Sequence, residues 1–183
     1  MVESCVRFKS PEALPADHIE PLFRDAFTQS EGEAEGRMIG ALARALLDTT
    51  PSEDLRVYLA EEGDELVGAI IVTRLTFEDP IEAFIVAPVA THPDWQRRGI
   101  AQGLLRCGIN DLRKAGVQLL MTYGDPAFYG KVGFKPVSPD AIQPPCDLSQ
   151  PIGWIGQSLT GGELPKLDGR CSCVEALADQ RYW

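Results

Sequence analysis

Residues 84–101 join an apolar strand to a helix through a short polar turn, and this order constrains the fold more than any other segment. They read FIVAPVATHPDWQRRGIA. A run rich in valine and isoleucine predicts a buried strand over 84–91, and an apolar stripe starting at Ile100 predicts a helix over 99–115. The first amides of a helix lack intrahelical acceptors and lie at the positive end of its dipole. The segment therefore predicts an α/β fold with an anion site at this helix start.

Periodic apolar residues divide most of the remaining chain into helices and strands. Helical spacing predicts helices over 17–30 and 34–47, separated by Gly32, with Pro21 in the first turn of the earlier helix. A hairpin turn is expected at 62–64. Shorter elements are also expected, namely strands over 6–9, 56–61, 66–76, 118–122, 134–137 and 154–159, and a short helix over 126–132.

The last part of the chain is less regular. Residues 138–151 carry four prolines and predict a long loop. Residues 170–174 favour one more strand, and residues 175–180 favour a last helical turn. No repeat or linker divides the sequence, so we expect one mixed α/β domain over 1–183. Its core would span about residues 5–137, and strands and a loop would follow over 138–183.

The net charge of −10 limits the classes of partner. It argues against a broad nucleic-acid-binding surface and favours a small or flexible cationic partner. The first residues do not form a signal peptide, and no apolar run approaches the roughly twenty residues of a membrane span. We therefore expect a cytoplasmic protein with no nucleic-acid or membrane partner.

The cysteines do not form a recognisable metal site. They are Cys5, Cys107, Cys146, Cys171 and Cys173. Their spacing is irregular, and His18 and His92 do not complete a tetrahedral set, so no metal is expected. Reduced thiols in or near the core are the simplest interpretation. Cys171 and Cys173 would share one face of a strand.

The turn Gln96–Ala101 has the composition of a phosphate-binding loop. Gly99 and Ala101 leave the backbone open to a ligand, and Arg97 and Arg98 bring positive charge to an acidic chain. A buried strand precedes the turn and a long helix follows it, so its amides are expected at the carboxyl end of the sheet.

Pro88 interrupts the strand that leads into this turn. Proline cannot donate to a sheet ladder, so it indicates an edge or a bulge. A bulge would separate the strand from its neighbour. The backbone of residues 89–91 would then be free to pair with an extended ligand that carries amide groups.

A second motif, PAFYGKVGF, occupies residues 126–134. Phe128 and Phe134 are most simply core residues. Tyr129 has two interpretations: a structural ring, or a phenol presented to a cleft as a general acid.

Together the two motifs resemble those of the GNAT superfamily of acetyl-CoA-dependent N-acetyltransferases. Residues 96–101, QRRGIA, resemble its pyrophosphate loop Q/R-x-x-G-x-G/A, and residues 128–134, FYGKVGF, resemble its F-Y-x-K-x-G-F segment. The resemblance covers roughly residues 5–137. It implies a mixed, mostly antiparallel sheet of about six to seven strands, splayed at the proline-containing bulge and flanked by about four helices.

The resemblance also implies roles for named residues. Acetyl-CoA would be the co-substrate, and a small-molecule or peptide primary amine would attack it directly in a ternary complex. An amide near Ala90 would hold the oxyanion, and Tyr129 would protonate or steady the departing thiolate. A homodimer is plausible for this family. The residues implied for cofactor binding are Val89, Ala90, Thr91, Gln96, Arg97, Arg98, Gly99, Ile100, Ala101 and Gln102.

The general base is less well defined, because the strand segment 84–90 contains no ionisable residue. Glu82, with Asp79 upstream, is the candidate base, although it also fits a solvated surface position. An ordered water or an acceptor that arrives deprotonated would replace it.

Other polar and aromatic residues have simple local interpretations. His92 suits turn polarity, although its position also fits a ring beside the cofactor. Asp125 suits a helix cap, and Arg37 a solvated face or an acceptor cleft. Three aromatic residues would either seal the core or line the acceptor cleft: Trp154, Tyr182 and Trp183.

The sequence leaves three hypotheses open besides acetyl transfer to an amine. The first is an acyl-CoA-binding regulatory module without catalysis, which the missing strand carboxylate favours. The second is an acyltransferase that uses another acyl-CoA. The third treats both motifs as unrelated turns of a generic α/β domain, which would have no affinity for CoA.

Overall fold

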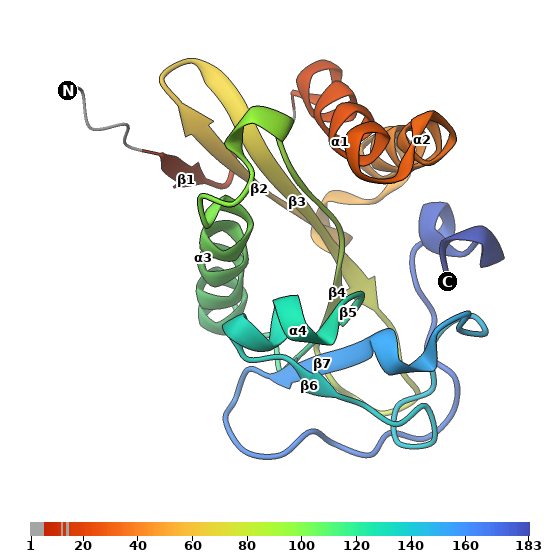
Figure 1. The fold of residues 1–183 in the computed structure, drawn as a ribbon. Helices are drawn as coiled ribbons and strands as arrows, with labels where there is room; N and C mark the ends of the chain where they lie inside the picture. The colour runs from red at the N-terminus through yellow and green to blue at the C-terminus, as the bar shows by residue number, and fades with distance from the viewer. Residues whose placement is uncertain (1–5, 12, 14) are drawn as a thin grey trace. The chain divides into compact units, whose positions relative to one another are not determined.

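The computed structural model describes residues 6–11, 13 and 15–183 as a mixed α/β fold with one seven-stranded sheet (Figure 1). Hydrogen-bonded neighbours follow the order β1-β2-β3-β4-β5-β7-β6. The strands are β1 (Arg7–Lys9), β2 (Leu55–Glu62), β3 (Glu65–Leu75), β4 (Ala83–Thr91), β5 (Leu119–Tyr123), β6 (Lys135–Pro136) and β7 (Trp154–Ser158). The helices are α1 (Ala16–Glu31), α2 (Glu33–Thr49), α3 (Ile100–Lys114) and α4 (Pro126–Tyr129). The predicted fold class is confirmed: the sheet is mostly antiparallel, with β4 and β5 parallel.

The described chain divides into two compact units. Unit 1 contains the chain up to Val72 together with Pro88–Gly108, and unit 2 contains Thr73–Ala87 together with Ile109–Trp183. Strands β3 and β4 and helix α3 contribute residues to both. A single domain over the whole chain stays a prediction.

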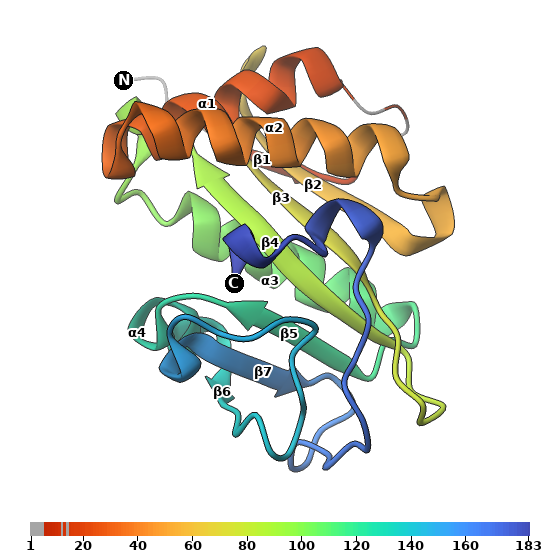
Figure 2. The same ribbon diagram turned by 90° about the vertical axis from the view of Figure 1, so that its right-hand side faces the viewer.

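Helices α1 and α2 of unit 1 form a closely packed pair, which lie side by side in both views (Figures 1 and 2). Gly32, with φ +100°, ends one helix and precedes the other, as its sequence position predicts. Gly36 permits the close approach, because a Cβ there would lie 2.5 Å from the Arg24 carbonyl oxygen. The apolar faces of the pair are buried, at Ile19, Leu22, Phe23, Ala26, Ile39, Leu42, Ala43, Leu46 and Leu47.

The β2–β3 hairpin forms the sheet of unit 1 together with β1 and the end of β4. Its turn contains Gly63 at φ +59°. Within this unit, α3 lies on one side of β2 and β3, while α1 and α2 lie on the other (Figure 1). Helix α3 packs closely on the hairpin, since Gly68 faces Ile100 at the start of the helix, and Gly108 further along it faces the ring of Tyr58. Small residues thus bring the helix start near the strand backbone.

Unit 2 is built around β5, which pairs with the start of β4 on one side and with β7 on the other. The Trp154 indole is fully buried and donates to the Ile142 carbonyl at 2.8 Å. Trp183 is also buried, donates to the Leu177 carbonyl at 2.9 Å, and has its ring 6.1 Å from that of Trp154. The two tryptophans therefore seal the core of this unit. Of the two interpretations given above, the structural one applies to both.

Two local predictions are wrong. Helix α1 begins at Ala16, one residue earlier than expected, so Pro21 is its sixth residue and lies beyond the first turn. The helix continues through Pro21, although proline has no backbone N–H to donate to the preceding turn. Residues 170–174 form no strand: they contribute only two isolated bridges, Gln143 to Arg170 and Thr76 to Ser172.

The tail and the thiols largely follow expectation. Residues 175–177 and 180–182 form 3-10 turns where a helical turn was expected. Within the described residues, Cys107, Cys146, Cys171 and Cys173 form no disulfide, whereas Cys5 lies outside the described residues. Burial raises the pKa of Cys171 to about 12 and that of Cys173 to about 11, which keeps both protonated near neutral pH.

Candidate active site

The turn between β4 and α3 is held by local hydrogen bonds of unit 1. The His92 N–H donates to the Val67 carbonyl at 2.8 Å, which ties the end of β4 to β3. The His92 Nδ1 accepts from the Asp94 N–H at 3.3 Å and caps the 3-10 turn over Pro93–Trp95. His92 therefore has the turn role that its sequence position suggests.

The backbone then adopts two left-handed conformations before the helix begins. Arg97 has φ +61° and Gly99 has φ +76°. A positive φ is less favourable for arginine than for glycine. The surrounding structure must therefore hold the backbone of this turn in that conformation. A Cβ at Gly99 would meet no atom within 4 Å, so conformation rather than space favours glycine at this position.

The start of α3 offers free amides to an anion. The Gly103 N–H is the first to find an acceptor, the Gly99 carbonyl, at 2.9 Å. Among the residues that the structure describes, the N–H groups of residues 99–102 have no acceptor. The first turns of α1 and α2 contain acidic residues, whereas the first turn of α3 contains none, so no side chain offsets the positive end of its dipole.

Two arginines add cationic charge beside these amides. Arg97 and Arg98 are exposed, and neither forms an ion pair within the described part of the chain. The Arg98 guanidinium lies 4.6 Å from the centre of the Trp95 ring, a cation–π contact that orients it. The loop therefore combines unpaired N–H donors with two positive charges that no carboxylate of the described residues neutralises, and this donor set suits a diphosphate.

The pairing of β4 with β5 is short. It joins Ala83, Phe84 and Ile85 to Leu119, Leu120 and Met121, although β4 continues to Thr91. At the next position, the Val86 carbonyl accepts from the Thr122 side chain at 2.7 Å. Within the described residues, the ladder thus includes none of residues 89–91. A bulge at Pro88 stays a prediction.

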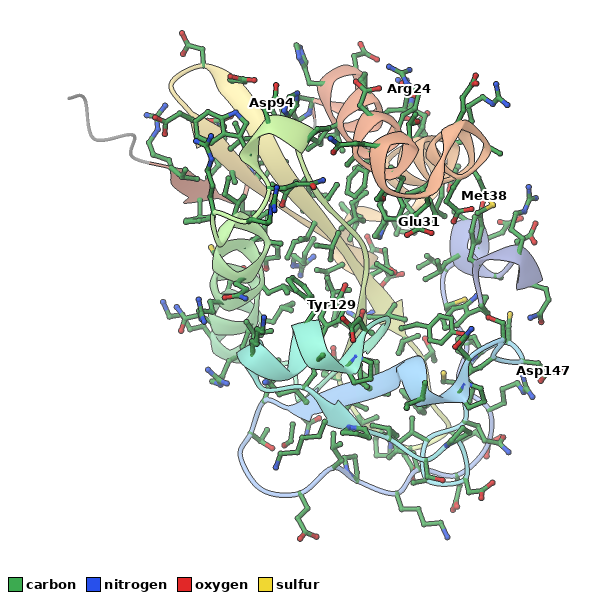
Figure 3. The ribbon with its side chains drawn as sticks, viewed as in Figure 1. Arg24, Glu31, Met38, Asp94, Tyr129 and Asp147 are labelled. Atoms are coloured by element: carbon green, nitrogen blue, oxygen red, sulfur yellow. The ribbon has the colours of Figure 1, made fainter. Side chains whose placement is uncertain are left out.

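Tyr129 is the last residue of α4 in unit 2 (Figure 3). Its ring meets those of Phe128 and Phe134 edge-on, with centroids 5.0 and 5.5 Å away. Burial raises the pKa of the phenol to about 12, and a hydrogen bond with Thr122 opposes this rise. The hydroxyl is therefore protonated at neutral pH and is a donor.

Thr122 is the residue of this site that the sequence analysis missed. Its hydroxyl donates to the Val86 carbonyl, and its interaction with the Tyr129 phenol lowers the pKa of that phenol. The only sequence signal was a threonine in an otherwise apolar buried strand. Such a residue needs partners that only the tertiary fold supplies.

Glu82 lies just before β4 and is occupied by structural contacts. Its carboxylate forms an ion pair with Arg74 at 2.6 Å, and its side chain is 58% exposed. Its main chain accepts from the N–H groups of Gln118 and Leu119 and donates to the Gln118 side chain. These contacts fit the surface interpretation of Glu82, and its role as a base stays a prediction.

Two further candidates have local roles. The Asp125 carboxylate accepts from the Ala127 N–H at 2.9 Å and caps α4, as expected. Arg37 forms an ion pair with Glu33 at 2.7 Å across one turn of α2, and its side chain is 66% exposed. A solvated helix face therefore describes Arg37 well.

The decisive comparison concerns residues 15–137, which match the family model of the acetyltransferase (GNAT) domain. The chain belongs to the GNAT acetyltransferase family. The resemblance inferred from the two motifs and the enzyme class are thereby confirmed. This GNAT protein is 31% identical over 140 residues to the uncharacterized N-acetyltransferase YjhQ of Escherichia coli K12. The match covers 73% of this chain and 77% of that protein.

Solved structures share the fold of this GNAT protein. The GNAT N-acetyltransferase YhbS from Escherichia coli, in complex with CoA, aligns with a TM-score of 0.78 at 18% identity, over 96% of this chain and 93% of its own. A GNAT acetyltransferase from Brucella melitensis, in complex with acetyl-CoA, aligns with a TM-score of 0.73 at 21% identity, over 96% and 99%. At these identities the likeness establishes the fold.

No helix among the described residues is long and apolar enough to cross a bilayer. In the same part of the chain, no group of three or more His, Cys, Asp or Glu residues is placed to hold a metal ion.

Proposed function

We propose that this GNAT protein transfers an acetyl group from acetyl-CoA to a primary amine by direct attack in a ternary complex. The observation that carries the proposal is the start of α3, where unpaired N–H groups follow two left-handed residues. Family membership and the complexes of its structural relatives with CoA or acetyl-CoA support it. Bound acetyl-CoA would supply the acetyl group as an activated thioester. The cytoplasmic location and the absence of a nucleic-acid partner stay predictions.

The turn would hold the cofactor diphosphate. The N–H groups of residues 97–102 would donate to its oxygens, and each such charge-assisted bond is worth about 1.5–3 kcal/mol. The main chain of residues 89–91 would pair with the amides of the pantetheine arm, because the ladder from β5 does not extend to it. An amide near Ala90 would face the developing oxyanion.

Tyr129 would act on the departing sulfur. With a pKa of about 12, the phenol holds its proton throughout the neutral range. An ordinary thiol has a pKa of about 8.5, so complete proton transfer from Tyr129 would be uphill by about 5 kcal/mol. We infer that Tyr129 steadies the thiolate mainly as a hydrogen-bond donor.

The proton of the amine would leave by one of the routes set out above. Glu82 remains the side-chain candidate, but Arg74 already uses its carboxylate. If an ordered water takes the proton, or if the acceptor arrives deprotonated, Glu82 is not needed as a base. Changing Glu82 to Gln tests the role: a base of this kind contributes about 10²–10⁴-fold to turnover, so an unchanged rate would remove Glu82 from the mechanism.

The cofactor site is tested by a matched pair of glycines at the two ends of α3. Gly99 has φ +76° and Gly116 has φ +84°, and a Cβ at either position meets no atom within 4 Å. Alanine should therefore cost each site a similar conformational energy of about 1–2 kcal/mol. Only G99A should weaken acetyl-CoA binding in calorimetry, by tenfold or more if it misdirects about one amide. Equal affinity of the two variants would contradict the assignment of the loop.

A binding module without catalysis is the second candidate. The engaged Glu82 and the lack of ionisable residues over 84–90 favour it. A panel of small-molecule and peptide amines with radiolabelled acetyl-CoA separates the two functions. Acetylated product supports transfer, whereas clear binding with no product from any amine supports the module. Repeating the panel with longer acyl-CoA donors tests whether acetyl is the preferred group.

A further inference from the structure

A groove of about 460 Å³ lies on unit 2 at the end of the sheet formed by β6 and β7. Its walls include Arg113 from the last turn of α3, Lys135 of β6, Ser158 of β7 and Glu163 of the loop that follows β7. Its lining includes neither Tyr129 nor any residue of 89–102. Its volume is within the range of small-ligand pockets, about 300–1,000 Å³.

The charged groups of the groove do not neutralise one another. Among the described residues, Arg113, Lys135 and Glu163 form no ion pair within 4.0 Å. Other arginines of the chain do pair with carboxylates, namely Arg24, Arg37, Arg44, Arg74, Arg170 and Arg181. The Arg113 Nε donates to the Leu159 carbonyl at 3.0 Å, which fixes the guanidinium. Its terminal amino groups have no partner in the described part of the chain.

The edge of β7 adds a main-chain donor. On the β5 side, the Leu159 N–H donates to the Gln118 carbonyl at 2.8 Å. Main-chain groups alternate in direction along a strand, so those of Ser158 face the opposite, β6 side. The ladder of β6 ends at Gly156, and Ser158 N–H therefore has no strand partner there.

The Gln157 side chain beside this edge is held by one hydrogen bond. The Gln157 Nε2 donates to the Val132 carbonyl at 2.8 Å, which fixes the orientation of the amide. Its Oε1 is buried without a partner in the described residues.

We propose that this groove binds a zwitterionic small molecule of the amino-acid class. Its carboxylate contacts Arg113, Lys135 and the Ser158 N–H, and its ammonium group contacts Glu163. A simple anion would be attracted by Arg113 and Lys135 but repelled by Glu163. A simple cation would be attracted by Glu163 but repelled by the two basic residues. Only a ligand with both charges matches both the cations and the carboxylate of the groove. This site does not depend on the proposed function.

The test is a titration of the ¹⁵N-labelled full chain with each proteinogenic amino acid at about 10 mM, above the millimolar Kd that weak ion-pair sites give. Acetate and ethylammonium serve as half-ligands. We expect at least one amino acid to shift the amide signals of Ser158, Gly162 and Glu163, with both half-ligands binding more weakly. No shift at these amides, or acetate binding as tightly as the best amino acid, would overturn the proposal. So would shifts centred on residues 89–102, because they would assign the ligand to the cofactor site.

Substitutions then locate the two charges. K135Q and E163Q should each weaken binding of the amino acid by about three- to fivefold, the effect of an exposed ion pair. K166Q, which changes an exposed lysine of the same loop outside the groove, should bind as the parent protein does. Acetyl-CoA affinity, measured by calorimetry, should be the same in all three variants. Parent-like amino-acid affinity in both K135Q and E163Q would contradict the proposed contacts.

Discussion

Replacing Tyr129 by phenylalanine removes one hydroxyl from unit 2 and retains its aromatic packing. The edge-on contacts with Phe128 and Phe134 involve only the ring. The hydroxyl itself interacts with Thr122 and with the charge of Asp125. Y129F therefore isolates the phenolic proton from the rest of the side chain, and its effect on stability can be worked out from the pKa.

The expected change in the free energy of unfolding depends on the pH at which the folded and unfolded chains lose that proton. Burial first, and then the charge of Asp125, raise the pKa of the folded phenol from 10.0 to about 12, against the hydrogen bond of Thr122. Between these pH values the unfolded chain releases the proton and the folded chain keeps it. The free energy of unfolding therefore falls as pH rises, by about 1 kcal/mol between pH 10 and 11 and by nearly 3 kcal/mol overall. Below pH 10 this contribution is constant, and in Y129F it is absent.

Urea unfolding of both proteins from about pH 9 to 11 measures this difference. Other groups titrate in the same range, but they are common to both chains and cancel in the comparison. The free energy of the parent protein relative to Y129F should fall by about 1 kcal/mol from pH 10 to 11. Parallel curves for the two proteins would refute the raised pKa, and with it the argument that the folded chain holds this proton more firmly than an exposed tyrosine does.

Three predictions concern packing. G36A should lower the free energy of unfolding by about 1–3 kcal/mol in urea, because its Cβ would lie 2.5 Å from main-chain oxygen. G40A, whose nearest contact is a side-chain carbon at 3.0 Å, should cost clearly less, and an equal cost would contradict the close-approach argument. G133A should lower the melting temperature, since φ is +98° and the new Cβ would lie 2.0 Å from the Gln157 Nε2; an unchanged value would show that this side chain moves freely. W154F should lose about 2–3 kcal/mol, through a smaller ring and an unpaired carbonyl, and a smaller loss in urea unfolding would indicate that the core collapses around it.

The sequence predicts the elements of unit 1 well because their signals are local. Apolar residues at helical spacing define α1, α2 and α3, and alternation and valine-rich runs define β2 and β3. Gly32 and Gly63 lie at the expected breaks, and both have positive φ. At each position, a glycine allows a backbone conformation that other residues rarely adopt. Such a requirement is visible in a single residue, so it needs no knowledge of the rest of the fold.

The errors concern features that depend on distant partners. The 170–174 segment has strand-like residues, but only Gln143 and Thr76 pair with it, each at one position, so no ladder forms. Thr122 of β5 interacts with Val86 and Tyr129, which belong to other elements of the fold. The Arg74 contact with Glu82 joins two strands across a loop. No periodicity in one segment encodes these contacts, because each depends on how another segment is placed.

The same distinction explains why the two motifs differ in how firmly they support a function. The proposed cofactor loop needs a helix start and backbone that tolerates positive φ, and Gly99 with the amides after it supplies both without a particular side chain. Such a site survives extensive sequence change, as a fold does at 18–21% identity to its structural relatives. Catalysis instead depends on individual side chains, whose environment sets their chemistry: burial keeps Tyr129 protonated, and Arg74 occupies Glu82. Binding of the cofactor is thus the part of the function that backbone geometry supports, and proton removal from the amine is the part that depends on the acceptor.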